Sequence, residues 1–274
     1  MNPGHRYQQR FSRLDQRGEA AFAGFLVLGD PSPAASLDLM RTLVRSGSDM
    51  LELGFPFSDP LADGPVIQEA MQRGLHQGMT PGECFRLIGE FRQSDPETPI
   101  GLLVYANLVC AWGMADFYRT CQSVGVDSVL VADAPLVECE PFCQAARQAD
   151  IDPVLLCPPN ISRSGLESLA RLGGGYTYLL SRAGVTGTTV AAGRPVDEIL
   201  RELHQLDAPR PLLGFGISEP RQVKAAWQAG AAGVICGSAI IQRIAATVGQ
   251  PARMLDDVGA FIAEMKAATR KPGN

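Results

Sequence analysis

Short apolar stretches recur along almost the whole chain, each followed by a longer stretch with apolar residues at helical spacing. The short stretches show no clear alternation of polar and apolar positions. Strands of this kind are typical of a parallel sheet whose two faces are both covered. We therefore expect strands at residues 21–28, 50–53, 100–105, 128–132, 154–157, 176–180, 212–215 and 233–236.

The longer stretches predict amphipathic helices, several of them bounded by proline at the start or glycine just past the end. In the first of these helices, residues 1–17, Tyr7, Phe11 and Leu14 share one side. The other helices are expected at 34–45, 65–76, 81–93, 115–123, 139–148, 165–172, 196–206, 219–229, 238–246 and 251–268.

Eight strands that alternate with helices within roughly 250 residues predict an α/β fold of the (β/α)8 TIM-barrel type. The barrel is expected to be a single domain over residues 1–274, because no stretch of biased composition divides the chain. It has an extra N-terminal helix and additional helices after strands 2 and 8. An open doubly wound sheet is the alternative. In a barrel the active site lies at the C-terminal ends of the strands.

The charge and composition of the chain argue against two classes of binding partner, nucleic acids and membranes. The net charge of -5 and the sequence pI near 5.3 argue against a nucleic-acid groove or an anionic membrane surface as the main binding partner. The N-terminal residues lack the apolar segment of a secretory signal, and no apolar run is long enough to span a membrane. We expect a soluble, cytoplasmic protein.

The residue types that bind metals are few and dispersed. The seven cysteines form no C-x-x-C motif, and His5, His76 and His204 lie far apart in polar surroundings. We therefore expect free, mostly buried thiols and no metal site. The lysines, at positions 224, 266 and 271, fall in predicted helices or the tail, which argues against a Schiff-base mechanism in the barrel.

The segment from Asp49 to Glu69 carries the candidate chemistry. Glu52 lies within the second predicted strand, and the Pro- and Asp-rich loop that follows holds Asp59 and Asp63. A carboxylate on a strand and another on the loop at that strand's C-terminal end form a candidate acid/base pair. Other readings are open for each residue. Glu52 could form a structural ion pair, Asp63 could cap the next helix, and Asp59 could serve only the turn.

Two glycine-rich junctions, at 214–218 and 236–239, follow the seventh and eighth strands. Loops in these places, together with a helix N-terminus, form the usual phosphate site of a TIM barrel. Gly216, Gly237 and Ser238 are thus candidate phosphate ligands. Thr186 and Gly187, in a loop after the sixth strand, are expected to close over the same anion.

Several longer motifs resemble the tryptophan synthase alpha chain family, and the resemblance covers nearly the whole chain. The most specific motif is L-E-L-G-F-P-F-S-D-P-L-A-D-G-P at 51–65. The other motifs are L-L-V-Y-A-N at 102–107, G-V-D-S-V-L-V-A-D at 125–133, C-P-P-N at 157–160, G-Y-T-Y-L-L-S-R-A-G-V-T-G at 175–187, G-F-G-I-S at 214–218 and G-S-A-I at 237–240.

The resemblance implies a TIM-barrel lyase that cleaves indole-3-glycerol phosphate to indole and glyceraldehyde 3-phosphate in tryptophan biosynthesis. It also implies an α2β2 complex with a beta chain that carries pyridoxal phosphate (PLP), while the alpha chain needs no cofactor. A barrel that cleaves the substrate alone and releases indole is one alternative. A non-catalytic barrel that regulates a PLP-dependent partner is another.

The resemblance also implies roles for individual residues. Glu52 would be the acid/base, and Asp63 would bind the indole N–H. The substrate-binding residues would be Phe25, Leu103, Leu130, Tyr178 and Phe215. The phosphate would be held by Gly187, Gly216, Gly237 and Ser238, and the beta chain would contact Pro56, Asp59 and Asn107. Val27 departs from the threonine usual in the family, which affects a hydrogen bond expected near the Asp63 loop.

Overall fold

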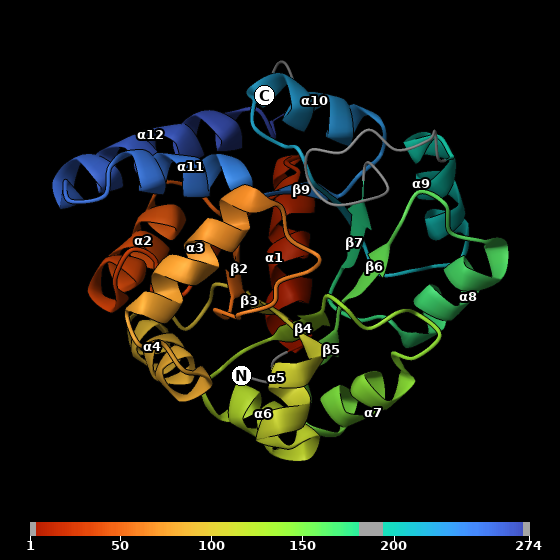
Figure 1. Cartoon of the computed structure of the whole chain (residues 1–274). Helices are drawn as coiled ribbons and strands as arrows, with labels where there is room; N and C mark the ends of the chain where they lie inside the picture. Colours follow the sequence, from red (N-terminus) through yellow and green to blue (C-terminus); the bar gives the residue numbers. More distant parts are fainter. Residues whose placement is uncertain (1–3, 181–193, 271–274) are drawn as a thin grey trace.

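The computed structural model describes residues 4–180 and 194–270, and in this part of the chain the strands form a parallel barrel (Figure 1). The hydrogen-bonded strand order is β5-β4-β3-β2-β1-β9-β8-β7-β6. All eight strand pairings are parallel. The strands are β1 Ala21–Val27, β2 Met50–Gly54, β3 Ile100–Val104, β4 Ser128–Val131, β5 Asp152–Pro153, β6 Leu155–Cys157, β7 Thr177–Leu180, β8 Pro211–Gly214 and β9 Gly233–Cys236.

The fifth predicted strand is divided into β5 and β6, which is why nine strands form a barrel predicted to have eight. The first half pairs with β4 and the second half pairs with β7. Val154 joins the halves and still donates its N–H to the carbonyl of Val129, at 3.0 Å. The chain therefore changes partner within one strand, and this change closes the barrel. The prediction of a TIM barrel is confirmed.

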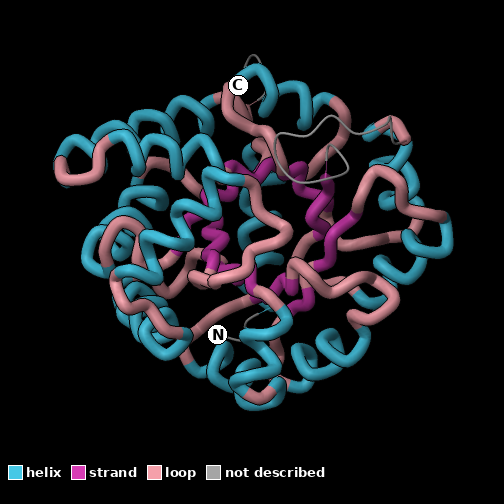
Figure 2. Tube along the Cα trace, in the orientation of Figure 1, coloured by secondary structure: helices cyan, strands magenta, loops and turns pink. Residues whose placement is uncertain are grey.

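Helices form a ring around the strands (Figure 2). Two helices follow β2 and two follow β9, as predicted from the sequence. A short helix after β3, α5, was not predicted. The helices are α1 Gly4–Arg17, α2 Pro33–Arg45, α3 Pro65–His76, α4 Pro81–Ser94, α5 Ala106–Trp112, α6 Met114–Ser123, α7 Glu140–Gln148, α8 Arg163–Leu172, α9 Val196–Gln205, α10 Pro220–Gln228, α11 Ser238–Ala246 and α12 Pro251–Ala267.

The N-terminal helix α1 closes one end of the barrel. Tyr7, Phe11 and Leu14, the predicted apolar side of this helix, are all buried and pack with residues of the barrel interior such as Met50 and Tyr176. In Figure 1 this helix is visible through the ring of strands. The closed end lies at the N-terminal ends of the strands, so the opposite, C-terminal end is left for a site.

Charged side chains at the closed end are paired. Asp127, just before β4, accepts hydrogen bonds from Arg6 at 2.8 Å and Arg92 at 3.2 Å. Asp49, just before β2, accepts one from Lys266 of α12 at 2.8 Å. Both aspartates are almost fully buried, and such burial is tolerated because each carboxylate has a cationic partner.

No helix in the described part of the chain has both the length and the apolar character needed to cross a membrane. The cysteines are free, and all except Cys110 are buried, as predicted. Cys139 and Cys143, for which the sequence suggested no role, lie with their sulfur atoms 3.9 Å apart at the start of α7. Neither contributes to the cavity described below.

Candidate active site

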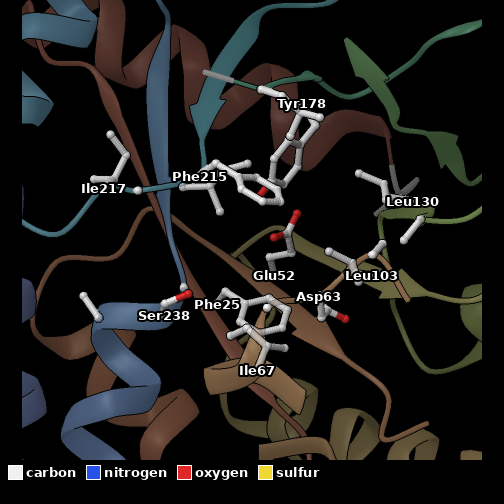
Figure 3. A pocket seen from close by; sticks show the side chains of 18 of the residues that line it. Phe25, Glu52, Asp63, Ile67, Leu103, Leu130, Tyr178, Phe215, Ile217 and Ser238 are labelled. Atoms are coloured by element: carbon white, nitrogen blue, oxygen red, sulfur yellow. The ribbon is translucent and has the colours of Figure 1, made fainter. Parts of the chain in front are cut away.

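A cavity of about 480 Å³ opens at the C-terminal end of the barrel (Figure 3). It contains both predicted carboxylates, all five predicted substrate-binding residues and the three described candidates for phosphate binding. Its walls are mostly apolar. The lining residues are Phe25, Glu52, Ala62, Asp63, Gly64, Ile67, Leu103, Leu130, Ala132, Leu156, Tyr178, Leu180, Phe215, Gly216, Ile217, Ser218, Ile235, Gly237, Ser238, Ala239 and Gln242.

Glu52 lies in the middle of this cavity, with Tyr178 and Phe215 on one side and Phe25 and Asp63 on the other (Figure 3). Its side chain reaches the cavity because β2 alternates its residues between the barrel interior and the helices. The residue is only 2% exposed. Its Oε1 accepts a hydrogen bond from the Tyr176 hydroxyl at 2.7 Å, and its Oε2 has no partner among the described residues.

Burial raises the pKa of Glu52 to about 7, and the nearby charge of Asp63 acts in the same direction, while the Tyr176 hydrogen bond opposes both. No ion pair to Glu52 is present in the described part of the chain. The described residues therefore give no support to the structural ion-pair reading of Glu52. A carboxyl group with a pKa near neutrality can both donate and accept a proton at physiological pH.

Asp63 lies opposite Glu52, on the loop between β2 and α3. Its Oδ2 accepts a hydrogen bond from the Tyr105 hydroxyl at 2.6 Å, and the same hydroxyl accepts one from the N–H of Ala62 at 3.2 Å. Burial raises the pKa of Asp63 to about 6, and the bond from Tyr105 opposes that shift. The helix-cap reading is wrong, because Gly64 occupies the N-cap position of α3 without a side-chain cap bond.

The apolar side chains form walls that suit a flat aromatic group. Phe25, Leu103 and Leu130 come from β1, β3 and β4, whereas Tyr178 and Phe215 come from β7 and the end of β8. Gly214 allows the Tyr178 ring to lie directly against β8, since a Cβ at Gly214 would approach that ring to 2.2 Å. The cavity therefore combines mostly apolar walls with two carboxyl groups, those of Glu52 and Asp63.

The far end of the cavity is suited to an anion. Gly237 and Ser238 begin α11, whose first N–H groups have no side-chain cap, and Gly216 lies on the adjoining loop with φ of +80°. Backbone N–H groups at a helix N-terminus attract a phosphate through hydrogen bonds and the helix dipole. Among the described lining residues there is no lysine, arginine or histidine. Thr186 and Gly187 lie outside the described residues.

Sequence reasoning missed two tyrosines that hold the carboxylates. Tyr176 bonds to Glu52 across 124 residues of sequence, and Tyr105 bonds to Asp63 across 42. No local spacing could have linked these pairs. The sequence did place each tyrosine at one end of a predicted strand, but it did not show which carboxylate the tyrosine would contact. Val27 does not line the cavity, and the hydrogen bond to Asp63 comes from Tyr105.

The three residues predicted to contact a partner differ in exposure. Asp59 and Asn107 are exposed, on the β2–α3 loop and on α5. Pro56 is buried, with its ring against Gly74 of α3, where an added Cβ would come within 2.7 Å of it. Leu61, two residues after Asp59 on the same loop, is 80% exposed, which is unusual for a large apolar side chain.

Taken together, these features define a class of TIM barrel with two buried carboxyl groups in a mostly apolar cavity and a helix N-terminus at its far end. Comparison with known proteins identifies the family. The sequence model described as Tryptophan synthase alpha chain matches residues 11–270. The chain belongs to the tryptophan synthase alpha chain family, and the resemblance in its motifs is confirmed.

Relatives of similar length support this assignment. The chain is 55% identical over 264 residues to the tryptophan synthase alpha chain of Shewanella oneidensis, covering 96% of this chain and 95% of the relative. It is 53% identical over 266 residues to that of Vibrio cholerae, with 97% and 99% covered. The barrel of this chain also resembles those of solved tryptophan synthase structures.

Two solved structures illustrate that likeness. Tryptophan synthase subunit alpha from Legionella pneumophila superposes with a TM-score of 0.85 at 29% identity, covering 98% of each chain. The a2b2 tryptophan synthase complex of Pyrococcus furiosus contains a chain with a TM-score of 0.80 at 28% identity, covering 91% of this chain and 98% of that one.

Proposed function

We propose that this protein is a carbon–carbon lyase that cleaves indole-3-glycerol phosphate to indole and glyceraldehyde 3-phosphate in tryptophan biosynthesis. The observation that carries the proposal is Glu52. Its carboxyl group is buried and has a pKa raised to about 7, and one of its oxygens has no partner among the described residues. It faces an apolar cavity whose far end suits an anion. These features supply one proton-transfer group for a substrate with an aromatic and a phosphorylated end.

The reaction is a retro-aldol cleavage, in which the bond between indole C3 and the adjacent carbinol carbon breaks. Indole C3 must gain a proton before that bond breaks, and the carbinol hydroxyl must lose a proton as its carbon becomes the aldehyde. Glu52 in its protonated form gives the first proton and, once ionised, accepts the second. A pKa near 7 suits both steps because neither form of the carboxyl group is rare at neutral pH.

Asp63 stabilises the intermediate of this reaction. Protonation at C3 places positive charge on the indole nitrogen, and an ionised carboxylate that accepts the N–H hydrogen bond lowers the energy of that state. The Tyr105 hydroxyl holds the carboxylate of Asp63 in position. Phe25, Leu103, Leu130, Tyr178 and Phe215 pack on the indole ring, and Gly216, Gly237 and Ser238 bind the phosphate, joined by Thr186 and Gly187.

The partner in this proposal is a tryptophan synthase beta chain, which carries PLP, while the alpha chain uses no cofactor of its own. The Pyrococcus furiosus relative is an a2b2 complex that shows mutual activation. In this chain the exposed Asp59, Leu61 and Asn107 form the candidate docking surface, and Pro56 supports it from beneath. Docking there orders the loop that carries Asp63, so that binding of the partner raises the rate of substrate cleavage. The complex acts in the cytoplasm.

The proposal is tested by incubating the purified chain with indole-3-glycerol phosphate and measuring indole and glyceraldehyde 3-phosphate in equal amounts, with and without its beta chain. We expect slow cleavage by the chain alone and faster cleavage in the complex. Equal rates in the two conditions would favour an independent indole-releasing enzyme. No product in either condition would favour a non-catalytic barrel that regulates its partner.

The docking surface is tested separately. Leu61→Asp places a charge at the centre of the candidate surface and should weaken beta-chain affinity by roughly 10-fold or more, because a desolvated charge in an interface is costly. Val248→Asp is a matched control, since Val248 is also an exposed apolar residue but lies between α11 and α12. Unchanged affinity in Leu61→Asp would move the docking surface elsewhere.

A further inference from the structure

The loop between β8 and α10, residues 215–219, provides one side of the anion site but has a strained backbone. Phe215 has φ of +66°, a left-handed conformation that is costly for a residue with a Cβ, and Gly216 follows with φ of +80°. Both residues line the cavity, as do Ile217 and Ser218. Such a conformation persists only if surrounding contacts hold it.

One side chain makes several contacts with this loop. The Gln222 side chain reaches back from the first turn of α10 and bonds to three residues of the loop. Its Nε2 donates to the carbonyl of Gly216 at 2.8 Å. Its Oε1 accepts from the N–H groups of Ser218 at 2.8 Å and Glu219 at 2.9 Å, and from the Ser218 hydroxyl at 3.3 Å. A single amide thus holds both ends of the loop.

A second contact comes from the barrel. The Cys236 thiol, at the end of β9, donates to the carbonyl of Ile217 at 3.1 Å. Burial raises the pKa of Cys236 to about 12, so the thiol keeps its proton at neutral pH and remains a donor. The carbonyl oxygens of Gly216 and Ile217 are therefore both occupied from outside the cavity. Within residues 4–180 and 194–270, no hydrogen bond uses the N–H group of either residue.

We propose that Gln222 is a positioning residue for the phosphate of the substrate. By binding the Gly216 carbonyl and the Ser218 N–H it fixes the two peptide planes between them, so that the N–H group of Ile217 stays available to the anion. This inference rests on the proposed function, because it assumes a phosphorylated substrate at this end of the cavity. Gln222 does not line the cavity and acts through the loop alone.

Helix capping is the competing role for this side chain. The bond from the Glu219 N–H to Oε1 is the one that a glutamine or glutamate makes three positions into a helix. The two roles use different atoms. Capping needs only the acceptor Oε1, whereas positioning also needs the donor Nε2. Gln222→Glu keeps the acceptor and removes the donor, so it separates them.

The experiment compares Gln222→Glu and Gln222→Met in the purified full chain. Calorimetry measures the affinity of each variant for an indole alkyl phosphate that cannot be cleaved, and for the same compound without its phosphate. Met removes the amide without adding charge, so agreement between the two variants excludes a simple charge effect. Gln228→Glu is the matched control, because Gln228 is exposed on the same helix and makes no hydrogen bond to the loop.

We expect both Gln222 variants to bind the phosphorylated compound roughly 10-fold more weakly, the size of effect that loss of one or two hydrogen bonds produces. Binding of the compound without phosphate should change by less than about twofold, and Gln228→Glu should match the wild type. In turnover, KM for the phosphorylated substrate should rise more than kcat falls. The melting temperature of Gln222→Glu should stay close to that of the wild type, since its cap is retained.

Equal weakening of both compounds would overturn the inference, since Gln222 would then support the whole cavity. Unchanged binding of both would overturn it as well. Failure of the proposed function gives a different result, because the wild-type chain would then not prefer the phosphorylated compound or cleave the substrate. Cleavage by the wild type together with unchanged Gln222 variants would reject only the positioning role.

Discussion

The two ends of the barrel bury carboxylates in opposite ways. At the closed end Asp127 has two arginines, Arg6 and Arg92, and Asp49 has Lys266. At the open end Glu52 has only a tyrosine hydroxyl as a partner among the described residues. Removing a carboxylate from water is costly at either end, and cations offset that cost for Asp127 and Asp49 but not for Glu52.

The difference separates stability from function. Burial raises the pKa of Asp127 and of Asp49, but their cationic partners oppose that shift, and each paired carboxylate fixes the elements that it joins. A buried carboxylate without a cation has a raised pKa and exchanges its proton near neutral pH, as Glu52 and Asp63 do. Changes at the closed end should therefore alter folding and leave the chemistry intact. Changes at the open end should alter the chemistry.

The largest effect is expected at the open end. Glu52→Gln keeps the shape of the side chain and removes its titration, so kcat for cleavage should fall by about 10²-fold or more, the usual contribution of a general acid/base. Steady-state indole release measures this effect. Glu97→Gln, at an exposed glutamate paired with Arg13 far from the cavity, is the control and should keep wild-type kcat. A Glu52→Gln rate within threefold of the wild type would contradict the assignment.

The closed end should respond in stability. Asp127→Asn leaves Arg6 and Arg92 buried without their counter-charge, and the free energy of unfolding should fall by about 3 to 5 kcal/mol. Denaturant titration measures this loss. Under conditions where the variant is folded, its kcat should equal that of the wild type. A fall in kcat without a loss of stability would show that the two ends are not separate in function.

The pH dependence of stability distinguishes the ends further. The pKa of Glu52 is about 7 in the folded chain and near 4.5 when unfolded, so between these values the folded state binds more protons. The contribution of Glu52 to stability is therefore fully present below pH 4.5 and falls by up to about 3 kcal/mol as the pH rises through 7. Glu52→Gln should remove that decline, which unfolding titrations at pH 5 and pH 8 would detect. Identical pH profiles would contradict the raised pKa.

A smaller effect is expected from the support of Asp63. Tyr105→Phe removes the hydroxyl that holds the carboxylate, and kcat/KM should fall by roughly 10-fold, the worth of one hydrogen bond to a charged group. Tyr118→Phe is a suitable control, because Tyr118 is buried on α6 away from the cavity. If both variants lose activity equally, the loss reflects packing and Tyr105 has no special role.

The sequence predicted the barrel because its strands are covered on both faces and so are apolar throughout. It did not predict where the strands end. We predicted Phe215 as the last residue of the strand at 212–215. The observed strand β8 ends at Gly214, and Phe215 follows it with φ of +66°. Helix α5 was missed because it is short and Tyr105, its N-cap residue, makes no side-chain cap bond. These features depend on tertiary contacts that local patterns do not record.

The site was predicted unevenly for a similar reason. Glu52 and Asp63 were recognised because a carboxylate in an apolar strand, or directly after one, is locally conspicuous. Tyr176 and Gln222 were not, since each acts on a residue or loop that only the closed barrel brings near. The paired charges at the closed end were missed too, because Asp127 and Arg6 lie 121 residues apart. Polar groups are visible in a sequence, but their partners are not.

Direct titration of Glu52 tests the central claim most closely. Isotope-labelled glutamate carboxyl groups can be followed by NMR across pH 4 to 9, and the Glu52→Gln variant identifies the signal of this residue. The account predicts a pKa of about 7 for Glu52 in the folded chain. A value near 4.5, that of a glutamate in water, would show that the open end neutralises its carboxylate as the closed end does, and would contradict the account.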